Sequence, residues 1–187
     1  MTEMELIPSM SNDAVLEYLD NFNSKHSNPR ATLDIGFEDQ KKLWVTLLEL
    51  IADPKKKICL ASALNASKIL TRNRQLMAQV VKRETLELLL LHGGITSEEN
   101  LSVREDIEHR DIRAIDESLR SLSNIYLQCA KSDAALSLEN DIIAGIIHQV
   151  KRYKELKIPL SVMSFDMRLL FLVTAYFPES RYAFTIV

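Results

Sequence analysis

The sequence predicts an all-α protein. Apolar residues recur at spacings of three and four through most of the chain, as on one face of a helix, and no strand-length run alternates between apolar and polar residues. Only four Gly and five Pro occur in 187 residues, which favours long helices. Aromatic residues make up only 6% of the chain, which argues against a β-sandwich or barrel.

The helices can be placed from their apolar spacing and from the residues that begin and end them. Ser11 and Asn12 are good N-caps for a first helix, and the turn residues of segment 24–36 predict a loop after it. Asp53-Pro54 ends one helix and begins the next, and His92-Gly93-Gly94 is a strong helix end. The expected helices begin after Asn12 and then cover 38–52, 55–71, 74–81, 84–91, 111–129, 140–157 and 165–177, with a short further helix after Ser132.

The charge of the chain argues against nucleic acid as a partner. The formal net charge is −3, whereas nucleic-acid-binding domains carry a basic patch. The densest basic run is Lys55-Lys56-Lys57, which follows Pro54. At the start of a helix these lysines oppose the helix dipole, so we expect them to be exposed to solvent.

The cysteines and the N-terminal residues indicate a cytoplasmic protein. Cys59 and Cys129 lie in apolar helical patterns and are expected to be buried free thiols, as in a reducing compartment. The first residues include Glu3 and Glu5 and contain no apolar run, so no signal peptide is expected. The longest apolar stretch, 169–175, is far too short to cross a bilayer, so no membrane span is expected.

Three segments share one form, which is a long helix, a polar turn and a short helix. The long helices include 63–70, 121–127 and 168–175, and the turns follow at 71–74, 131–133 and 177–181. This unit is typical of an armadillo repeat, and such units must stack to bury their apolar faces. The sequence therefore predicts a right-handed armadillo/HEAT-like helical solenoid, incomplete at its C-terminus, as a single domain over 1–187 with an exposed loop at about 95–108. A plain helical bundle is the alternative architecture.

Polar residues follow one face of two of the expected long helices. The first set is Ser62, Asn65, Lys68 and Arg72, and the second is Glu117, Arg120, Asn124 and Gln128. Spacings of three and four place the members of each set on one helix face. In a stacked solenoid such helices line a concave groove, so both sets are candidates for binding a partner. An ordinary solvated helix face has the same pattern.

No motif predicts catalysis, a metal or a cofactor. The four histidines lie in different elements, and none pairs with metal-ligand spacing. Gly93-Gly94 lacks the Gly-Lys-Ser/Thr of a phosphate-binding loop, and neither GxSxG nor CxxC occurs. His109 lies among Asp106, Glu108 and Asp111, where solvated charge is the simpler interpretation. The sequence therefore predicts a binding protein that carries out no covalent chemistry.

Four stretches resemble a known family. They are residues 22–27 (FNSKHS), 67–74 (SKILTRNR), 117–125 (ESLRSLSNI) and 165–175 (FDMRLLFLVTA). Through them the sequence resembles the N-terminal part of synembryn, the "resistance to inhibitors of cholinesterase" family. The resemblance spans nearly the whole chain in the same order, with 95–108 as the divergent part. Members of the family are much longer than 187 residues, so the sequence is interpreted as a fragment.

The resemblance implies a guanine nucleotide exchange factor and folding chaperone for G-protein α subunits, acting in G protein-coupled receptor signalling. It implies a concave groove that grips the C-terminal helix of GDP-bound or nucleotide-free Gα and promotes GDP release by binding alone. The resemblance also implies a location in the cytoplasm or at the cell cortex, which agrees with the composition. It adds neuronal calcium sensor proteins as candidate further partners. The candidate Gα-binding residues are Lys68, Arg72, Asn124, Asn65, Gln128, Phe165 and Arg168.

Two other classes of function stay open. A general armadillo scaffold for extended peptides would need Trp-Asn ladders along the groove, and the only Trp, Trp44, lies on a different helix. An enzyme using His109 would need its acidic neighbours to converge in a pocket.

Overall fold

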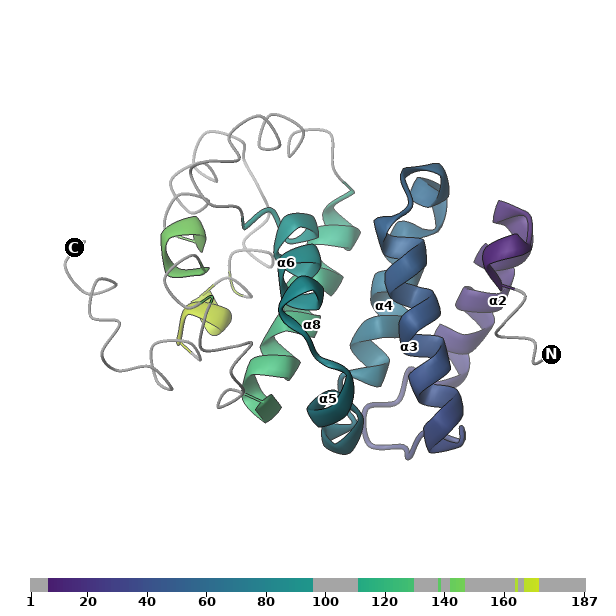
Figure 1. Ribbon diagram of the computed structural model, residues 1–187, viewed down its shortest axis with the longest axis horizontal. Coiled ribbons are helices and arrows are strands. Elements are labelled where there is room, and N and C mark those ends of the chain that lie inside the picture. The colour runs from purple at the N-terminus through teal and green to yellow at the C-terminus, as the bar shows by residue number, and fades with distance from the viewer. Residues whose placement is uncertain are drawn as a thin grey trace. The chain divides into compact units, whose positions relative to one another are not determined.

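A computed structural model describes residues 7–95, 111–129, 138, 142–146, 164 and 167–171. Every regular element in these ranges is a helix, as Figure 1 shows. The predicted all-α class is confirmed, whereas the stacking of repeats into a solenoid and the single domain over 1–187 stay predictions. The chain divides into two compact units, Met1–Val80 and Val81–Val187, and each is described by itself.

The first unit is a set of helices packed around α4. Its elements are η1 (Ile7–Ser9), α2 (Asn12–Lys25), α3 (Phe37–Ala52), η2 (Pro54–Cys59), α4 (Leu60–Leu70) and α5 (Arg74–Val80). Helix α4 packs against both α2 and α3, and α5 packs against α3 (Figure 1). Each of the helices α2, α3 and α4 contributes a fully buried leucine, namely Leu19, Leu47 and Leu64. Burial of such apolar side chains stabilises the unit.

The predicted caps explain where α2 and α3 lie. The Ser11 side chain accepts a hydrogen bond from the Ala14 backbone N–H at 3.3 Å and begins α2, as predicted. Helix α3 begins with Glu38 and Asp39 in its first turn, where negative charge is favourable, and ends at Asp53. The segment 26–36 between them contains no helix, so the loop predicted over 24–36 is confirmed from residue 26 onward, whereas Ser24 and Lys25 belong to the last turn of α2.

The helix predicted over 55–71 begins later than expected. Residues Pro54–Cys59 form the 3₁₀ helix η2, with Lys56 at φ −98° and ψ 16°, and α4 begins only at Leu60. Two features hold this tighter turn. The Asp53 carboxylate accepts from the Lys55 N–H at 2.9 Å, and the Lys56 ammonium donates to the Met10 carbonyl at 2.8 Å. Lys55 and Lys57 are exposed, as predicted, but Lys56 is half-buried by its contact with Met10.

The second unit is built on the packing of α6 (Arg83–His92) against α8 (Ile112–Cys129). Leu86, Leu89, Leu119, Leu122 and Ile125 are fully buried. The Ser118 hydroxyl donates to the Leu89 carbonyl and joins the two helices at a buried position. Residues 142–146 and 167–171 are helical and agree with the helices predicted there, while the short helix after Ser132 lies outside the described residues.

The end of α6 corrects the start of the exposed loop predicted at about 95–108. Ile95 is only 3% exposed, so the residue expected to begin an exposed loop belongs to the core. Its N–H donates to the Leu90 carbonyl at 2.9 Å, and the Gly94 N–H donates to the Leu91 carbonyl at 3.2 Å. This pair of bonds is the Schellman motif, which usually brings an apolar residue back onto the helix. Residues 96–108 lie outside the described residues.

We expect Gly94→Ala to lower the free energy of unfolding by about 1–2 kcal/mol, because Gly94 has φ 77°, a left-handed conformation that a Cβ disfavours. Gly36→Ala is the matched control, since Gly36 has φ −56°, which Ala adopts readily, and a Cβ there would lie 3.5 Å from the Asp39 carboxylate, an ordinary contact. Urea denaturation of both variants checks this. Equal effects of the two substitutions would contradict the role given to Gly94.

Candidate partner-binding surface

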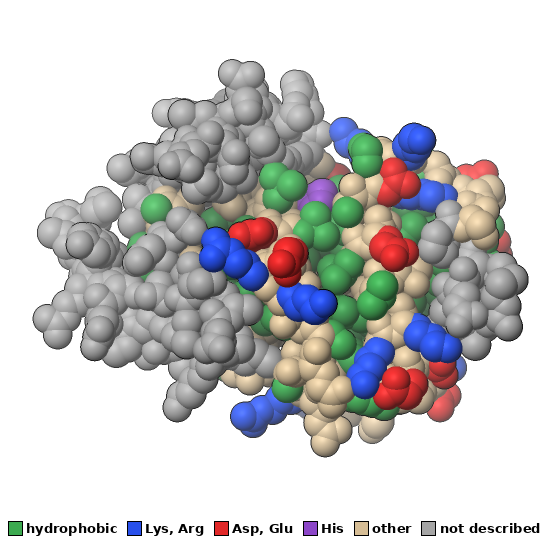
Figure 2. All heavy atoms as spheres, viewed as in Figure 1, with side chains coloured by type: hydrophobic (Ala, Val, Ile, Leu, Met, Phe, Trp, Pro, Cys, Tyr) green, Lys and Arg blue, Asp and Glu red, His purple; other side chains and the backbone are tan. Residues whose placement is uncertain are grey.

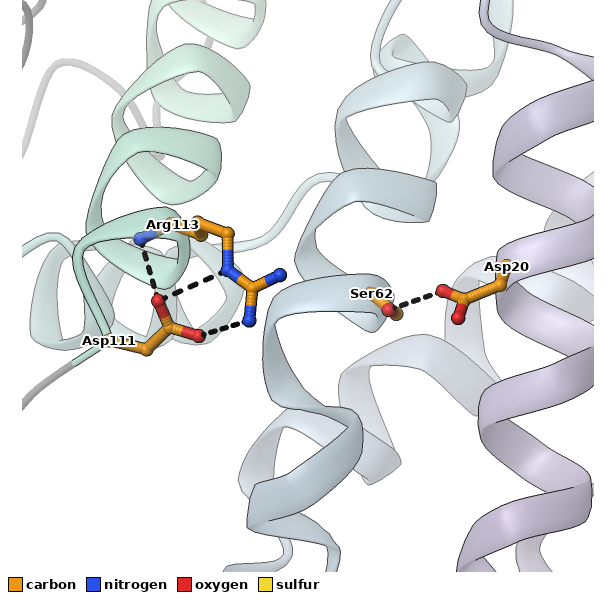
Figure 3. Close-up of polar contacts among 4 residues, drawn as sticks. All are labelled: Asp20, Ser62, Asp111 and Arg113. Atoms are coloured by element: carbon orange, nitrogen blue, oxygen red, sulfur yellow. Dashed lines mark hydrogen bonds and ion pairs between the residues drawn. The ribbon is translucent and has the colours of Figure 1, made fainter.

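The polar residues predicted to share a face of α4 are all half-buried, and the first of them contacts α2. The Ser62 hydroxyl donates to the Asp20 carboxylate at 2.7 Å (Figure 3). The Asn23 side-chain amide donates to the Ser62 carbonyl at 3.0 Å. The N-terminal end of this polar row therefore joins α4 to α2, and the residues nearer the C-terminal end of α4 are the stronger candidates for a partner.

Arg72 holds the loop that follows α2. It lies in the turn after α4, and its Nη1 donates to the carbonyls of His26 at 3.1 Å and Asn28 at 3.3 Å. Both acceptors are backbone atoms of the 26–36 loop. Arg72 therefore has a structural role that the helix periodicity did not predict, beside any role in binding a partner.

Lys68 lies one helical turn before Arg72, in the last turn of α4. Positive charge is favourable there because the helix dipole is negative at its C-terminus. The Lys68 carbonyl accepts from the Thr71 hydroxyl at 2.7 Å, which satisfies one of the last carbonyls of the helix. Two cations at a spacing of four residues suit a ligand that carries carboxylates. Asn65, also half-buried, lies one turn earlier on α4.

Asn73, which was not a predicted site residue, fixes the turn that carries Arg72. Its side-chain oxygen accepts from the N–H groups of Gln75 at 3.0 Å and Leu76 at 3.2 Å, so it caps α5. Its amide donates to the Gln40 side-chain oxygen at 2.8 Å, and the Gln40 amide donates to the Ile35 carbonyl at 2.8 Å. The cap could have been expected from Asn before a helix, but the link to Gln40 spans 33 residues and has no local signal.

His26 is a buried imidazole at the end of α2. It is 7% exposed, and its ring centroid lies 4.8 Å from that of Phe22. Burial lowers the pKa of His26 below its ordinary value of 6.5, the charges of Lys25 and Arg72 lower it further, and Asp34 opposes them. The neutral form is therefore favoured in the folded chain.

We expect the free energy of unfolding to fall as the pH drops below about 6.5, because the unfolded chain then binds a proton at His26 that the folded chain resists. Above that pH both states are neutral at His26, and this contribution is constant. Chemical denaturation at about pH 7 and about pH 5 measures the change. His26→Gln should show a smaller loss over the same interval, and an identical loss would contradict the assignment.

The second polar set lies on α8, in the second unit. Glu117, Arg120, Asn124 and Gln128 are all half-buried, as expected for one face. Arg120 pairs with Asp116 at 3.0 Å, one turn earlier on α8. The helix itself begins where Asp111 accepts from the Arg113 N–H at 2.9 Å, and the Arg113 side chain donates back to the carboxylate (Figure 3). Burial raises the pKa of Asp111, but these hydrogen bonds and the charge of Arg113 outweigh it, so the pKa is lowered below its ordinary value.

The remaining predicted site residues differ in what the structure says of them. The side-chain oxygen of Gln128 is hidden from solvent and accepts no hydrogen bond within the described part of the chain. Arg168 is exposed in the helical stretch 167–171, and Phe165 lies outside the described residues. Lys68, Arg72 and Asn65 are brought together on α4 and the turn after it, and Asn124 and Gln128 on α8.

Other features bear on the alternative functions. Trp44 is 1% exposed in the core of the first unit and cannot form part of a Trp ladder on a groove. Within the described ranges, no group of His, Cys, Asp and Glu is arranged to hold a metal ion, and no helix there is long and apolar enough to cross a membrane. His109 lies outside those ranges. Cys59 is a buried free thiol, as predicted, and burial raises its pKa; the side chain of Cys129 is not among those described.

The surface charge is mixed. On the face that Figure 2 shows, basic and acidic side chains lie interspersed among apolar ones. This face therefore carries no broad basic patch of the kind that binds nucleic acid.

A cavity of about 570 Å³ lies beside α2 and is lined in part by Tyr18, Phe22, His26 and Ile35.

These features define an all-helical protein with cationic and amide side chains along single helix faces. The family described as "Guanine nucleotide exchange factor synembryn" matches residues 63–186, and the chain belongs to this family. The match includes α4 from Ala63 onward and the whole of α8.

Several curated proteins are similar along most of the chain. A protein named "Chaperone Ric-8A" from Gallus gallus is 31% identical over 174 residues, which is 93% of this chain and 31% of the relative. "Chaperone Ric-8A" from Mus musculus is 33% identical over 173 residues, 90% of this chain and 31% of the relative. "Chaperone Ric-8B" from Mus musculus is 27% identical over 175 residues, 90% of this chain and 31% of the relative. The chain thus spans about a third of the length of these relatives.

Proposed function

We propose that this chain acts in guanine nucleotide exchange and folding of G-protein α subunits by binding the C-terminal helix of Gα. Lys68, Arg72 and Asn124 are its first contact residues, with Asn65, Gln128, Phe165 and Arg168 as further ones. The observation that carries the proposal is the family match, which includes all seven of these positions. The cytoplasm and the cell cortex are the proposed location.

The chemistry of α4 supports a carboxylate-bearing partner. Lys68 and Arg72 lie one helical turn apart at the C-terminal end of this helix, and both are half-buried. Partly desolvated cations bind carboxylates more strongly than fully exposed ones, because water screens the charge less. An acidic helical segment of a partner that follows the α4 face would meet both cations.

The proposed architecture is an armadillo/HEAT solenoid whose long helices line a concave groove. The mechanism within it is binding, without a covalent step. A protein that holds the nucleotide-free form of Gα more tightly than the GDP-bound form promotes GDP release by that difference in affinity alone. No residue of this chain needs to contact the nucleotide.

Binding of purified Gα to the immobilised chain, measured by biolayer interferometry with and without excess GDP, tests the proposal. We expect tighter binding when Gα is nucleotide-free, and weaker binding when GDP is added. Equal binding in both conditions would favour the second candidate, a scaffold without exchange activity. No binding to either form by a folded chain would contradict the Gα assignment itself.

A further inference from the structure

Two adjacent residues of the turn between α4 and α5 hold the two ends of the 26–36 loop. Arg72 donates to the carbonyls of His26 and Asn28 at the start of the loop. Asn73 reaches the other end through Gln40, whose amide donates to the Ile35 carbonyl. We propose that this turn is a clamp on the 26–36 loop, and that a ligand carboxylate at Arg72 opens the Arg72 side of the clamp. This proposal rests on the proposed function.

The Arg72 side of the clamp acts on a compact turn. The Asn28 carbonyl accepts from both Arg72 Nη1 at 3.3 Å and the Ala31 N–H at 3.2 Å. The Asn28 side-chain oxygen accepts from the Arg30 N–H at 3.0 Å, and Pro29 occupies the second position of the turn. One guanidinium nitrogen therefore links the end of α2, through His26, to this turn.

Within the described part of the chain, few other polar contacts of the loop would replace Arg72. The ion pair of Lys25 and Asp34 joins the end of α2 to the loop at 3.4 Å, but its side chains are 62% and 85% exposed. Pairs as exposed as this contribute little to stability. The Gln40 link remains when Arg72 is withdrawn, so the loop is expected to loosen near residues 26–31 and to stay attached at Ile35.

The competition follows from the chemistry of the acceptors. Arg72 donates to neutral carbonyls, whereas a carboxylate carries a full negative charge and therefore attracts the same guanidinium more strongly. A ligand carboxylate that takes the same Nη1 hydrogens must displace the carbonyls. Ligand binding and loop attachment then oppose each other, and the effect is reciprocal, so weakening the loop attachment should strengthen ligand binding.

Hydrogen–deuterium exchange of the whole chain, with and without a synthetic peptide of the Gα C-terminal helix, tests the clamp. We expect amides of residues 26–31 to exchange several-fold faster when the peptide is bound, while the amides of α3 and α4 are unchanged or slower. In parallel, Asn28→Ala removes the bond to the Arg30 N–H and loosens the turn without a change of charge. This variant should bind the peptide several-fold more tightly.

Thr32→Ala is the matched control, because Thr32 is exposed in the same loop and its substitution also keeps the charge. Its peptide affinity should equal that of the unmodified chain. If the peptide binds but residues 26–31 exchange at the same rate and Asn28→Ala binds no tighter, the clamp is refuted and the proposed function stands. If the unmodified, folded chain does not bind the peptide, the proposed function fails, and the ligand-driven opening fails with it.

Discussion

Leu119→Ala is expected to lower the free energy of unfolding by about 3 kcal/mol, the largest effect of any substitution considered for this chain. Leu119 is fully buried on α8, and a Cβ added to Gly93 at the end of α6 would lie only 3.1 Å from its Cδ2. The side chain therefore fills the contact between the two helices. Truncation would lose its buried apolar surface and leave a cavity.

Leu127→Ala is the control for this prediction, because Leu127 lies on the same helix but is 49% exposed. Thermal or urea denaturation of the two variants should differ by about 2 kcal/mol or more. Similar losses for both would mean that α8 does not pack on α6 through Leu119.

Arg72→Glu is expected to lower the free energy of unfolding by about 2 kcal/mol, because it removes charged hydrogen bonds and places a carboxylate beside two carbonyls. The affected partners are the carbonyls of His26 and Asn28. Arg74→Glu makes the same change of charge at an exposed position in the first turn of α5, where a negative charge is favourable. Its effect should stay within about 0.5 kcal/mol in the same denaturation experiment.

A loss of stability in Arg74→Glu as large as that in Arg72→Glu would contradict the structural role of Arg72. The prediction also matters for tests of function. Arg72→Glu removes a candidate Gα contact and lowers the stability of the chain at the same time, so Lys68 is the better position for a charge reversal.

The helix ends that depend on local caps could be predicted from the sequence. Ser11, Asp53 and the Gly93-Gly94 pair mark real helix ends, because each acts on backbone groups within a few residues. The start of α4 could not be predicted, since the 3₁₀ turn before it is held by Lys56 contacting Met10, 46 residues away. The burial of Ile95 was not predicted, because the acidic residues that follow it favoured an exposed loop. The Schellman motif at Gly94 explains the burial.

The candidate site could be predicted only in part for the same reason. Spacing correctly placed Asn65 and Lys68 on α4, Arg72 in the turn after it, and Asn124 and Gln128 on α8, because periodicity fixes which residues share a helix face. It could not show that Arg72 donates to a loop 44–46 residues away, or that Gln40 links Asn73 to Ile35. Contacts between distant segments leave no periodic signal in a single sequence.

The most direct test of the central claim is fluorescence anisotropy of a labelled Gα C-terminal peptide titrated with this chain, with Lys68→Glu and with Lys57→Glu. The exposed Lys57 provides the same change of charge in η2, before the opposite end of α4 from Lys68. The account predicts saturable binding that Lys68→Glu weakens roughly tenfold or more, because a favourable charge contact becomes repulsive, and that Lys57→Glu leaves unchanged. No saturable binding by the folded chain, or equal losses in both variants, would contradict a Gα site on α4.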